Sequence, residues 1–359
     1  MPGRKPPNNA AVSLDVSALG TDFSQWPEFH NGVAAGLRLA AGQADITRTW
    51  IVYNKPAAPN HAHAGLLMGL GLQGHLKALE VTDVYRYLTQ EHHATNVGIL
   101  LGMAGALRGT CDATVSKMMF LHIPAIHPHY YPDLEVPSIV QTAALLGVGL
   151  VYQGTNHRRM TEMLLAEIGH RATNDRLVDR EGYSLMAGLA LGLVTLGAGS
   201  SAVGLADLQI ENCLRRYMEG GKDPTESSSA APPDGTQSCR IKEGEMVNID
   251  ITAAGATLAL GLMFLKTNNA SVAARLSIPD TNFLMEYVRP DYLLLRVVSK
   301  ALVMWDDIKP TQAWIESQVS LCLQHPRMLC LQHPQWLIAW PVSLLQSCLN
   351  CTVCAGAPR

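Results

Sequence analysis

Residues 183–199, YSLMAGLALGLVTLGAG, form the stretch of sequence that decides the fold. It carries no charge, and within it Gly188 and Gly192 lie four residues apart. Residues four apart share one face of a helix, so two glycines leave a groove into which a neighbouring backbone can approach closely. Because each glycine costs about 1 kcal/mol relative to alanine inside a helix, the pattern predicts a helix enclosed by other helices.

The same spacing of small residues recurs along the chain. A small residue, three apolar or small residues and a glycine begin at residues 32, 65, 98, 143, 188 and 257. Self-similarity at intervals of a few tens of residues is the signature of repeat architectures. The glycines predicted to pack helix against helix are Gly32, Gly36, Gly65, Gly69, Gly98, Gly102, Gly147, Gly188, Gly192 and Gly261.

A second mark follows seven residues after the motif glycine in four copies. These predicted helix-end turns are Gly109, Gly154, Gly199 and Asn268. Glycine and asparagine tolerate the left-handed conformation that closes a helix. The segments beyond the turns have a helical apolar period; after Gly154, Met160 and Leu164 share one face and Glu167 lies opposite. We therefore predict an all-α, two-layer α-solenoid with apolar inner helices and amphipathic outer helices, forming an open arc.

The composition argues against a nucleic-acid partner and indicates a reducing compartment. The 27 Lys+Arg stand against 30 Asp+Glu without a basic run, which argues against nucleic-acid binding. Five of the eight cysteines lie in the last forty residues, and the other three show no pairing pattern, which is typical of a reducing compartment. The polar first nine residues do not resemble a signal peptide. We expect a location in the nucleus and the cytoplasm.

The chain divides into three parts in this interpretation. Residues 1–28 are an extended N-terminal segment, residues 29–319 are helical repeats, and residues 320–359 are an atypical Cys-rich tail. Within the repeats, residues 220–243 are rich in Gly, Pro, Ser and charge and read as a disordered surface loop. Residues 225–229 in that loop form a candidate phosphorylation segment, although we favour a loop that is not phosphorylated.

The tail allows two interpretations. LCLQHP at residues 321–326 recurs at residues 329–334, and Cys348, Cys351 and Cys354 follow at intervals of three. Thiolates at such spacing with His325 or His333 could bind zinc or an iron–sulfur cluster. We favour translated repetitive DNA as the source of a perfect short tandem copy, and we expect a poorly ordered tail.

Other patterns that suggest chemistry or a membrane are weaker. Residues 69–74 match the dinucleotide fingerprint G-x-G-x-x-G, but a helix is predicted where that motif requires a preceding strand. Histidine pairs at residues 61/63, 92/93 and 127/129 lack a nearby acid or cysteine to complete a zinc site, and we interpret them as polar loop residues. Residues 183–206 are uncharged, but their internal Gly and Ser and the absence of a basic flank disfavour a membrane helix. We expect no catalytic residue, cofactor, metal or small-molecule substrate.

The small-x-x-x-Gly helix pairs resemble proteasome/cyclosome repeats. Several phrases are similar in particular to the large scaffold subunits of the anaphase-promoting complex, over about residues 13–319. They are SLDVSALGTDFSQWPEFHNGVAAGL at 13–37, WIVYNKP at 50–56, GVGLVYQGTNHR at 147–158, DREGYSLMAGLALGLV at 179–194 and RPDYLLLRVVSKALVMWDDI at 289–308. The phrases at 50–56 and 289–308 disfavour the alternative, a scaffold of the proteasome regulatory particle.

The resemblance implies a non-catalytic scaffold of a multi-subunit ubiquitin ligase that acts in mitosis. In this family the repeats close into a ring near the coactivator and the small Doc-domain subunit, which are therefore the expected partners along with other subunits of the complex. No catalytic residue is carried over. With about six copies, the chain is expected to be a fragment of such a ring, with an exposed apolar face near residues 293–305.

Overall fold

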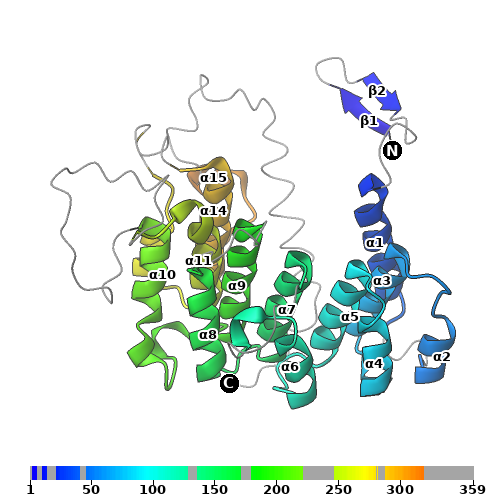
Figure 1. The fold of residues 1–359 in the computed structure, drawn as a ribbon. Coiled ribbons are helices and arrows are strands. Elements are labelled where there is room, and N and C mark those ends of the chain that lie inside the picture. The colour runs from blue at the N-terminus through cyan, green and yellow to red at the C-terminus, as the bar shows by residue number, and fades with distance from the viewer. Residues whose placement is uncertain are drawn as a thin grey trace. The chain divides into compact units, whose positions relative to one another are not determined.

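The computed structural model describes residues 2–5, 10–13, 22–40, 46–127, 136–170, 179–220, 246–279, 281 and 288–318. The chain folds as two compact units. Figure 1 shows their helices and strands by label. Unit 1 comprises Met1–Gln153 and Asp175–Asp179, and unit 2 comprises Gly154–Asn174 and Arg180–Arg359. The predicted insert, apart from Gly220, and the predicted tail lie outside the described residues, as do the phosphorylation segment and the cysteine cluster.

Unit 1 begins with a small antiparallel hairpin and continues with helices. Strand β1 (Pro2–Lys5) pairs with β2 (Ala10–Ser13), and Pro2 lies opposite Ser13. Helix α1 packs on α3, α3 on α5 and α5 on α7, while the shorter α4 and α6 lie against α5 and α7. The helices are α1 (Asp22–Leu37), α2 (Arg48–Tyr53), α3 (His61–Leu72), α4 (Val81–Leu88), α5 (His93–Ala106), α6 (Ala113–Phe120) and α7 (Ser138–Val151), with 3-10 turns η2 (His75–Ala78) and η3 (Pro124–Ile126).

Unit 2 repeats this alternation of long and short helices. Helix α9 packs on α11 and α11 on α14, while α8, α10 and α12 lie against α9, α11 and α14. Its helices are α8 (Arg158–Ile168), α9 (Arg180–Val194), α10 (Ile210–Glu219), α11 (Ile249–Met263), α12 (Ala270–Arg275), α14 (Pro290–Val303) and α15 (Gln312–Gln318), with 3-10 turns η4 (Gly199–Ser201), η5 (Ala206–Leu208) and η6 (Trp305–Asp307).

The predicted all-α class is confirmed, with the hairpin as an addition. Helix α1 begins at Asp22, so residues 22–28 are helical although an extended segment was expected there. The long helices form an inner layer in each unit and are apolar on nearly every side. In α5, all residues from Ala94 to Ala106 except Asn96 are buried, as expected for a helix with neighbours on two sides.

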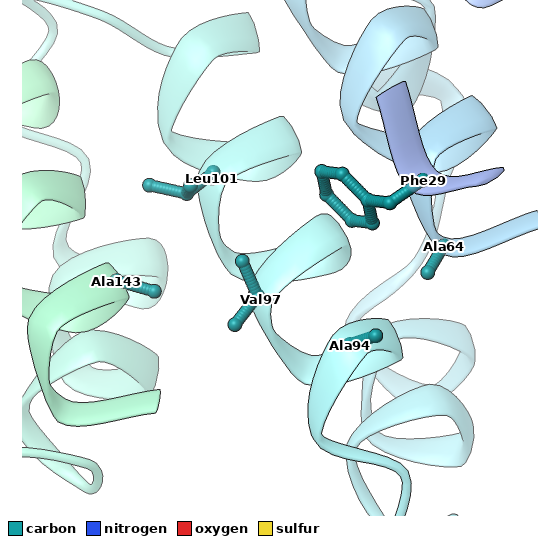
Figure 2. Close-up of a cluster of buried hydrophobic side chains, with 6 residues drawn as sticks. All are labelled: Phe29, Ala64, Ala94, Val97, Leu101 and Ala143. Atoms are coloured by element: carbon teal, nitrogen blue, oxygen red, sulfur yellow. The ribbon is translucent and has the colours of Figure 1, made fainter. Parts of the chain in front are cut away.

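The core of unit 1 consists of side chains from successive inner helices (Figure 2). Phe29 of α1 is the only aromatic ring in this cluster, and small side chains from the other helices surround it. Alanine opposite phenylalanine lets the helix axes approach while the space between them stays filled. The cluster consists of Phe29, Ala64, Ala94, Val97, Leu101 and Ala143.

One outer helix differs from its predicted pattern. In α8, Met160 and Leu164 are buried as predicted, but Glu167, which was expected to face solvent, is only 6% exposed. Its carboxylate accepts a hydrogen bond of 2.6 Å from the hydroxyl of Tyr183 in α9. Burial and this carboxylate raise the pKa of Tyr183. The expected orientation of Glu167 was wrong because the tyrosine hydroxyl compensates for its burial.

Helix α14 is partly exposed along its length. Tyr292, Ser299 and Val303 are buried, whereas Leu294 is exposed and the other apolar residues of the helix are half-buried.

The stretch at residues 183–206 that was considered as a membrane helix does not form one long helix, because α9 ends at Val194 after 15 residues. Across the described parts of the chain, the helices are too short or too polar to cross a bilayer.

Candidate functional site

The predicted packing glycines of α1, α3 and α5 lie where the backbones of adjacent inner helices touch. A β-carbon added to Gly65 of α3 would overlap the carbonyl oxygen of Phe29 in α1, and one added to Gly32 would overlap a carbonyl oxygen of α3. A β-carbon on Gly36 would lie 2.8 Å from the Cα atom of Gly69. Real side chains do not tolerate such distances, so the contact between α1 and α3 requires glycine on both helices.

The contact between α3 and α5 follows the same principle. A β-carbon on Gly98 would overlap the carbonyl oxygen of Ala64, and one on Gly102 would lie 2.8 Å from the carbonyl oxygen of Leu67. Gly71 faces the backbone of Gly102 at similarly close range. Gly71 was considered only as part of a nucleotide fingerprint, and its packing role was missed.

Gly147 of α7 has a different environment. Its added β-carbon would meet the side chain of Met119 in the outer helix α6, at 2.6 Å from the sulfur atom. Methionine has three rotatable bonds and adapts its shape, so this contact is less restrictive than one with a backbone. Among the predicted packing glycines, Gly147 therefore tolerates a small side chain best.

In unit 2, glycines join α9 to α11 and α11 to α14. Gly188 and Gly255 face each other, and a β-carbon on Gly188 would overlap the carbonyl group of Gly255. One on Gly192 would lie 2.8 Å from Cβ of Leu262, and one on Gly261 would lie 2.6 Å from Cβ of Ser299. Gly255 was missed because alanine occupies the position four residues later, where the motif required glycine.

Turns after the inner helices bond to the backbone of the next inner helix. The N–H of Gly109 donates to the carbonyl oxygen of Leu150 at 2.9 Å, and that of Gly154 donates to Leu193 at 2.9 Å. Gly197 donates to Leu262, and Lys266 donates to Leu302, each at 3.0 Å. Each donor lies three residues after the last residue of its helix. We call these turns the backbone latches.

The second position of each latch lies two residues further on. Cys111, Asn156 and Asn268 donate to the carbonyl oxygens of Val151, Val194 and Val303 at 3.1 Å. All the latch residues have positive φ, from 51° to 69°. An α-helix leaves its last four carbonyl groups without partners inside the helix. The latches supply donors for two of them in α7, α9 and α14 and for one in α11.

The predicted helix-end turns are all in the latches, but they occupy two different positions. Gly109 and Gly154 are first positions, whereas Gly199 and Asn268 are second positions, with φ of 58° and 51°. The count of seven residues failed to align them because the motif glycine lies four residues before the end of α5 and α7, but two before the end of α9 and α11. Lys266, a first position without glycine, was therefore missed.

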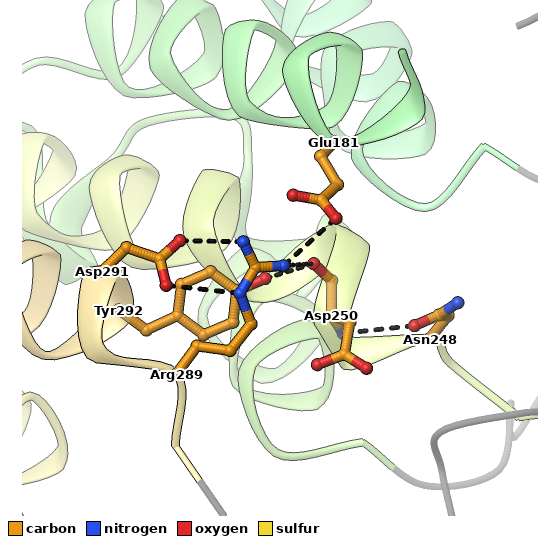
Figure 3. Close-up of polar contacts among 6 residues, drawn as sticks. All are labelled: Glu181, Asn248, Asp250, Arg289, Asp291 and Tyr292. Atoms are coloured by element: carbon orange, nitrogen blue, oxygen red, sulfur yellow. Dashed lines mark hydrogen bonds and ion pairs between the residues drawn. The ribbon is translucent and has the colours of Figure 1, made fainter. Parts of the chain in front are cut away.

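A polar clasp joins the opposite, N-terminal ends of the inner helices in unit 2 (Figure 3). The guanidinium of Arg289 donates to Glu181 of α9 at 3.1 Å, to Asp291 of α14 at 3.0 and 3.2 Å, and to the backbone carbonyl of Asp250 in α11. The Tyr292 hydroxyl donates to the same Asp250 carbonyl. One arginine thus connects three successive inner helices.

The electrostatics of the clasp follow from these contacts. The hydrogen bond to Glu181, and to a smaller extent that to Asp291, raises the pKa of Arg289. The arginine is therefore charged at any physiological pH. Burial raises the pKa of Tyr292 to about 12, so its hydroxyl stays protonated and able to donate. The clasp therefore has permanent charge and serves to hold helices rather than to transfer protons.

The histidines do not form a metal site in the described residues. His61 and His63 lie in the first turn of α3 and His93 begins α5, so the loop assignment was wrong for these three. His92 lies in the loop before α5 and caps that helix by accepting from the Thr95 N–H. Burial, with nearby Lys55, lowers the pKa of His63 to about 4. In the described ranges, three or more His, Cys, Asp or Glu side chains do not gather in a metal-binding arrangement. His129 lies outside those ranges.

The nucleotide fingerprint also has the wrong context. Gly69 and Gly71 lie inside helix α3. A dinucleotide-binding fingerprint would instead form a loop that follows a strand. Gly74 has φ of 87° in the turn after the helix. The segment serves helix packing and closes a helix.

These features together define a class of protein: a helical repeat scaffold, in which backbone contacts and latches join successive inner helices within each unit. The comparisons with known proteins identify the family. A family model described as the APC1 fifth domain matches residues 113–357, and one described as the APC1 fourth domain matches residues 1–108. The chain belongs to the family of anaphase-promoting complex subunit 1.

Similar proteins come from distant organisms. The chain is 46% identical to anaphase-promoting complex subunit 1 of Arabidopsis thaliana over 319 residues, which cover 88% of this chain and 19% of that protein. It is 45% identical to the subunit 1 of Homo sapiens over 323 residues, 88% of this chain and 17% of that protein. A negative regulator of mitosis from Emericella nidulans is 36% identical over 86% of this chain and 14% of its own length. The chain thus spans less than a fifth of the length of these relatives. Their names do not favour the alternatives of a proteasome scaffold or a membrane protein.

The helix contacts predict different outcomes for two glycines of unit 1. Replacing Gly65 with alanine should lower the free energy of unfolding by about 3 kcal/mol, because the added methyl group pushes the α1 and α3 backbones apart. Gly147→Ala is the matched control, and its effect should stay within about 1 kcal/mol because Met119 can move and alanine favours the helix. Urea denaturation followed by circular dichroism measures both. Equal losses would show that close backbone approach does not set stability.

The clasp predicts that charge alone cannot replace arginine. Arg289→Lys should lower the free energy of unfolding by about 1–2 kcal/mol, because an ammonium group cannot reach all three helices with fixed geometry. Arg275→Lys is the control, since among the described residues Arg275 pairs with Glu211 alone, and the change should alter stability by about 0.5 kcal/mol or less. Thermal unfolding of both variants provides the comparison. A clasp variant as stable as the control would contradict this role.

Proposed function

We propose that the chain is a non-catalytic scaffold segment of the anaphase-promoting complex, a ubiquitin ligase of mitotic cell-cycle control. The observation that carries this proposal is the regular joining of inner helices by glycine contacts and latches. It is supported by the similarity of 88% of this chain to a part of subunit 1. Such an array fixes the spacing of the helices, and outer helices and turns then present side chains at set positions. Rigid presentation is what a scaffold must supply to its partners.

The proposed partners are other subunits of the same complex. The resemblance to proteasome/cyclosome repeats favours the Doc-domain subunit and the coactivator among them, and the scaffold would position both. The proposed location is the nucleus and the cytoplasm, in keeping with a complex that acts on mitotic substrates. Ubiquitin transfer is assigned to other subunits.

Co-expression with a defined set of the remaining subunits tests the proposal. The full chain should co-purify with them, and Gly65→Leu, which disrupts the joining of α1 to α3, should reduce their recovery. The chain alone, mixed with ubiquitin and its activating and conjugating enzymes, should form no ubiquitin conjugates. A folded chain that recovers no subunit would refute the scaffold role, and conjugates formed by the chain alone would refute the non-catalytic one.

A further inference from the structure

The inner helix α5 is capped at its N-terminus by a histidine. The Nδ1 atom of His92 accepts a hydrogen bond of 3.2 Å from the Thr95 N–H and lies 2.8 Å from the Thr95 hydroxyl oxygen. The residues that usually cap helices are serine, threonine, aspartate and asparagine, and none of them changes its charge near neutral pH. Histidine ordinarily gains a proton near pH 6.5. This cap is therefore made by a group that titrates.

The cap requires the neutral form of the ring. An imidazole nitrogen accepts a hydrogen bond only while it carries no proton, and in the cation both ring nitrogens are donors. The Thr95 N–H can therefore bond to Nδ1 of His92 only when the ring proton is on Nε2. In the cation, Nδ1 can still donate to the Thr95 hydroxyl, but the Thr95 N–H loses its acceptor. Because Thr95 is 1% exposed, water replaces that acceptor only if the first turn of α5 opens.

The surroundings of His92 oppose a second proton on its ring. The ring of His61, in the first turn of α3, lies edge to face with that of His92, and the ring centres are 4.9 Å apart. Burial lowers the pKa of His92 most, and His61 and His93, the ionisable groups that act on it, lower it further. A positive charge at the N-terminus of a helix is also disfavoured by the helix dipole.

Carboxylates that would offset these effects are scarce around α5. The elements that pack against it are α3, η2, α4, α6 and α7, and within their bounds Asp83 of α4 is the one carboxylate. Asp83 is bound to Arg48 at 2.6 Å, and Arg86 lies 4.0 Å from it. Glu91 precedes His92 in the chain but is exposed to water, where its effect is weak.

We propose that the N-terminal turn of α5 is a proton-sensitive joint, closed while His92 is neutral and opened when its ring gains a second proton. Opening moves His92 away from His61, so the contact between the N-terminal ends of α3 and α5 weakens. The clasp at the corresponding ends in unit 2 has no such dependence near neutral pH, because Arg289 keeps its charge. The inference is independent of the proposed function, since it concerns the folded chain alone.

The direction of the pH dependence follows from proton binding. The unfolded chain binds the proton of His92 more readily than the folded chain, because folding lowers the pKa of this residue. The stability that the neutral cap contributes is therefore complete above the ordinary histidine pKa of about 6.5. It is lost as the pH falls below that value towards the pKa in the folded chain.

Thermal unfolding of the full chain at pH 7.5 and pH 5.0 tests this inference. His92→Asn supplies a cap that does not titrate in this range, and His93→Asn, which changes an exposed residue that does not form the cap, is the matched control. Between the two pH values, the melting temperature of the native chain should fall by about 2 °C more than that of His92→Asn. His93→Asn should fall as the native chain does. Equal falls for the native chain and His92→Asn would overturn the inference.

Nuclear magnetic resonance of the native chain, with isotope-labelled ring nitrogens, tests the cap without relying on a variant. The His92 signals are assigned through the proximity of this ring to that of His61. At pH 7.5, Nδ1 of His92 should have the chemical shift of an unprotonated nitrogen and Nε2 that of a protonated one. A proton on Nδ1 at this pH would overturn the inference even if His92→Asn failed to fold.

Discussion

The contact of one helix backbone with another is the interaction on which the rest of the structure depends. Where Gly65 meets Phe29 and Gly188 meets Gly255, a single methyl group would not fit. Close approach lets whole helix faces exclude water with alanine and valine between them, so the core needs few large side chains. The same constraint explains why the inner helices accept glycine despite its low helix propensity.

The latches and the clasp act on opposite ends of the inner helices. At the C-terminal ends, positive-φ residues direct their N–H groups to carbonyls that a helix leaves unpaired. At the N-terminal ends in unit 2, Arg289 connects α9, α11 and α14. The inner helices of unit 2 are thereby held at both ends, by backbone hydrogen bonds at one and by charge at the other.

The sequence predicted the helical class because it depends on short spacings. The predicted packing glycines other than Gly147 lie against a neighbouring inner helix. The sequence misplaced the latch register, because the motif glycine sits at a variable distance from the helix end. It assigned Glu167 to solvent, because the partner hydroxyl of Tyr183 belongs to another helix. The clasp was not predicted at all, since Arg289 and Glu181 are 108 residues apart and neither has a local signature. Long-range pairs of single polar residues leave no periodic trace in one sequence.

Hydrogen exchange at the latches tests the central claim most directly. Gly109, Gly154, Gly197 and Lys266 are exposed residues in turns, yet their N–H groups donate to the next inner helix. The account predicts that these four amides exchange as slowly as amides inside the inner helices, since they open only when the helices separate. Exchange as fast as that of solvated loop amides would contradict it, because the latches would then not join one inner helix to the next.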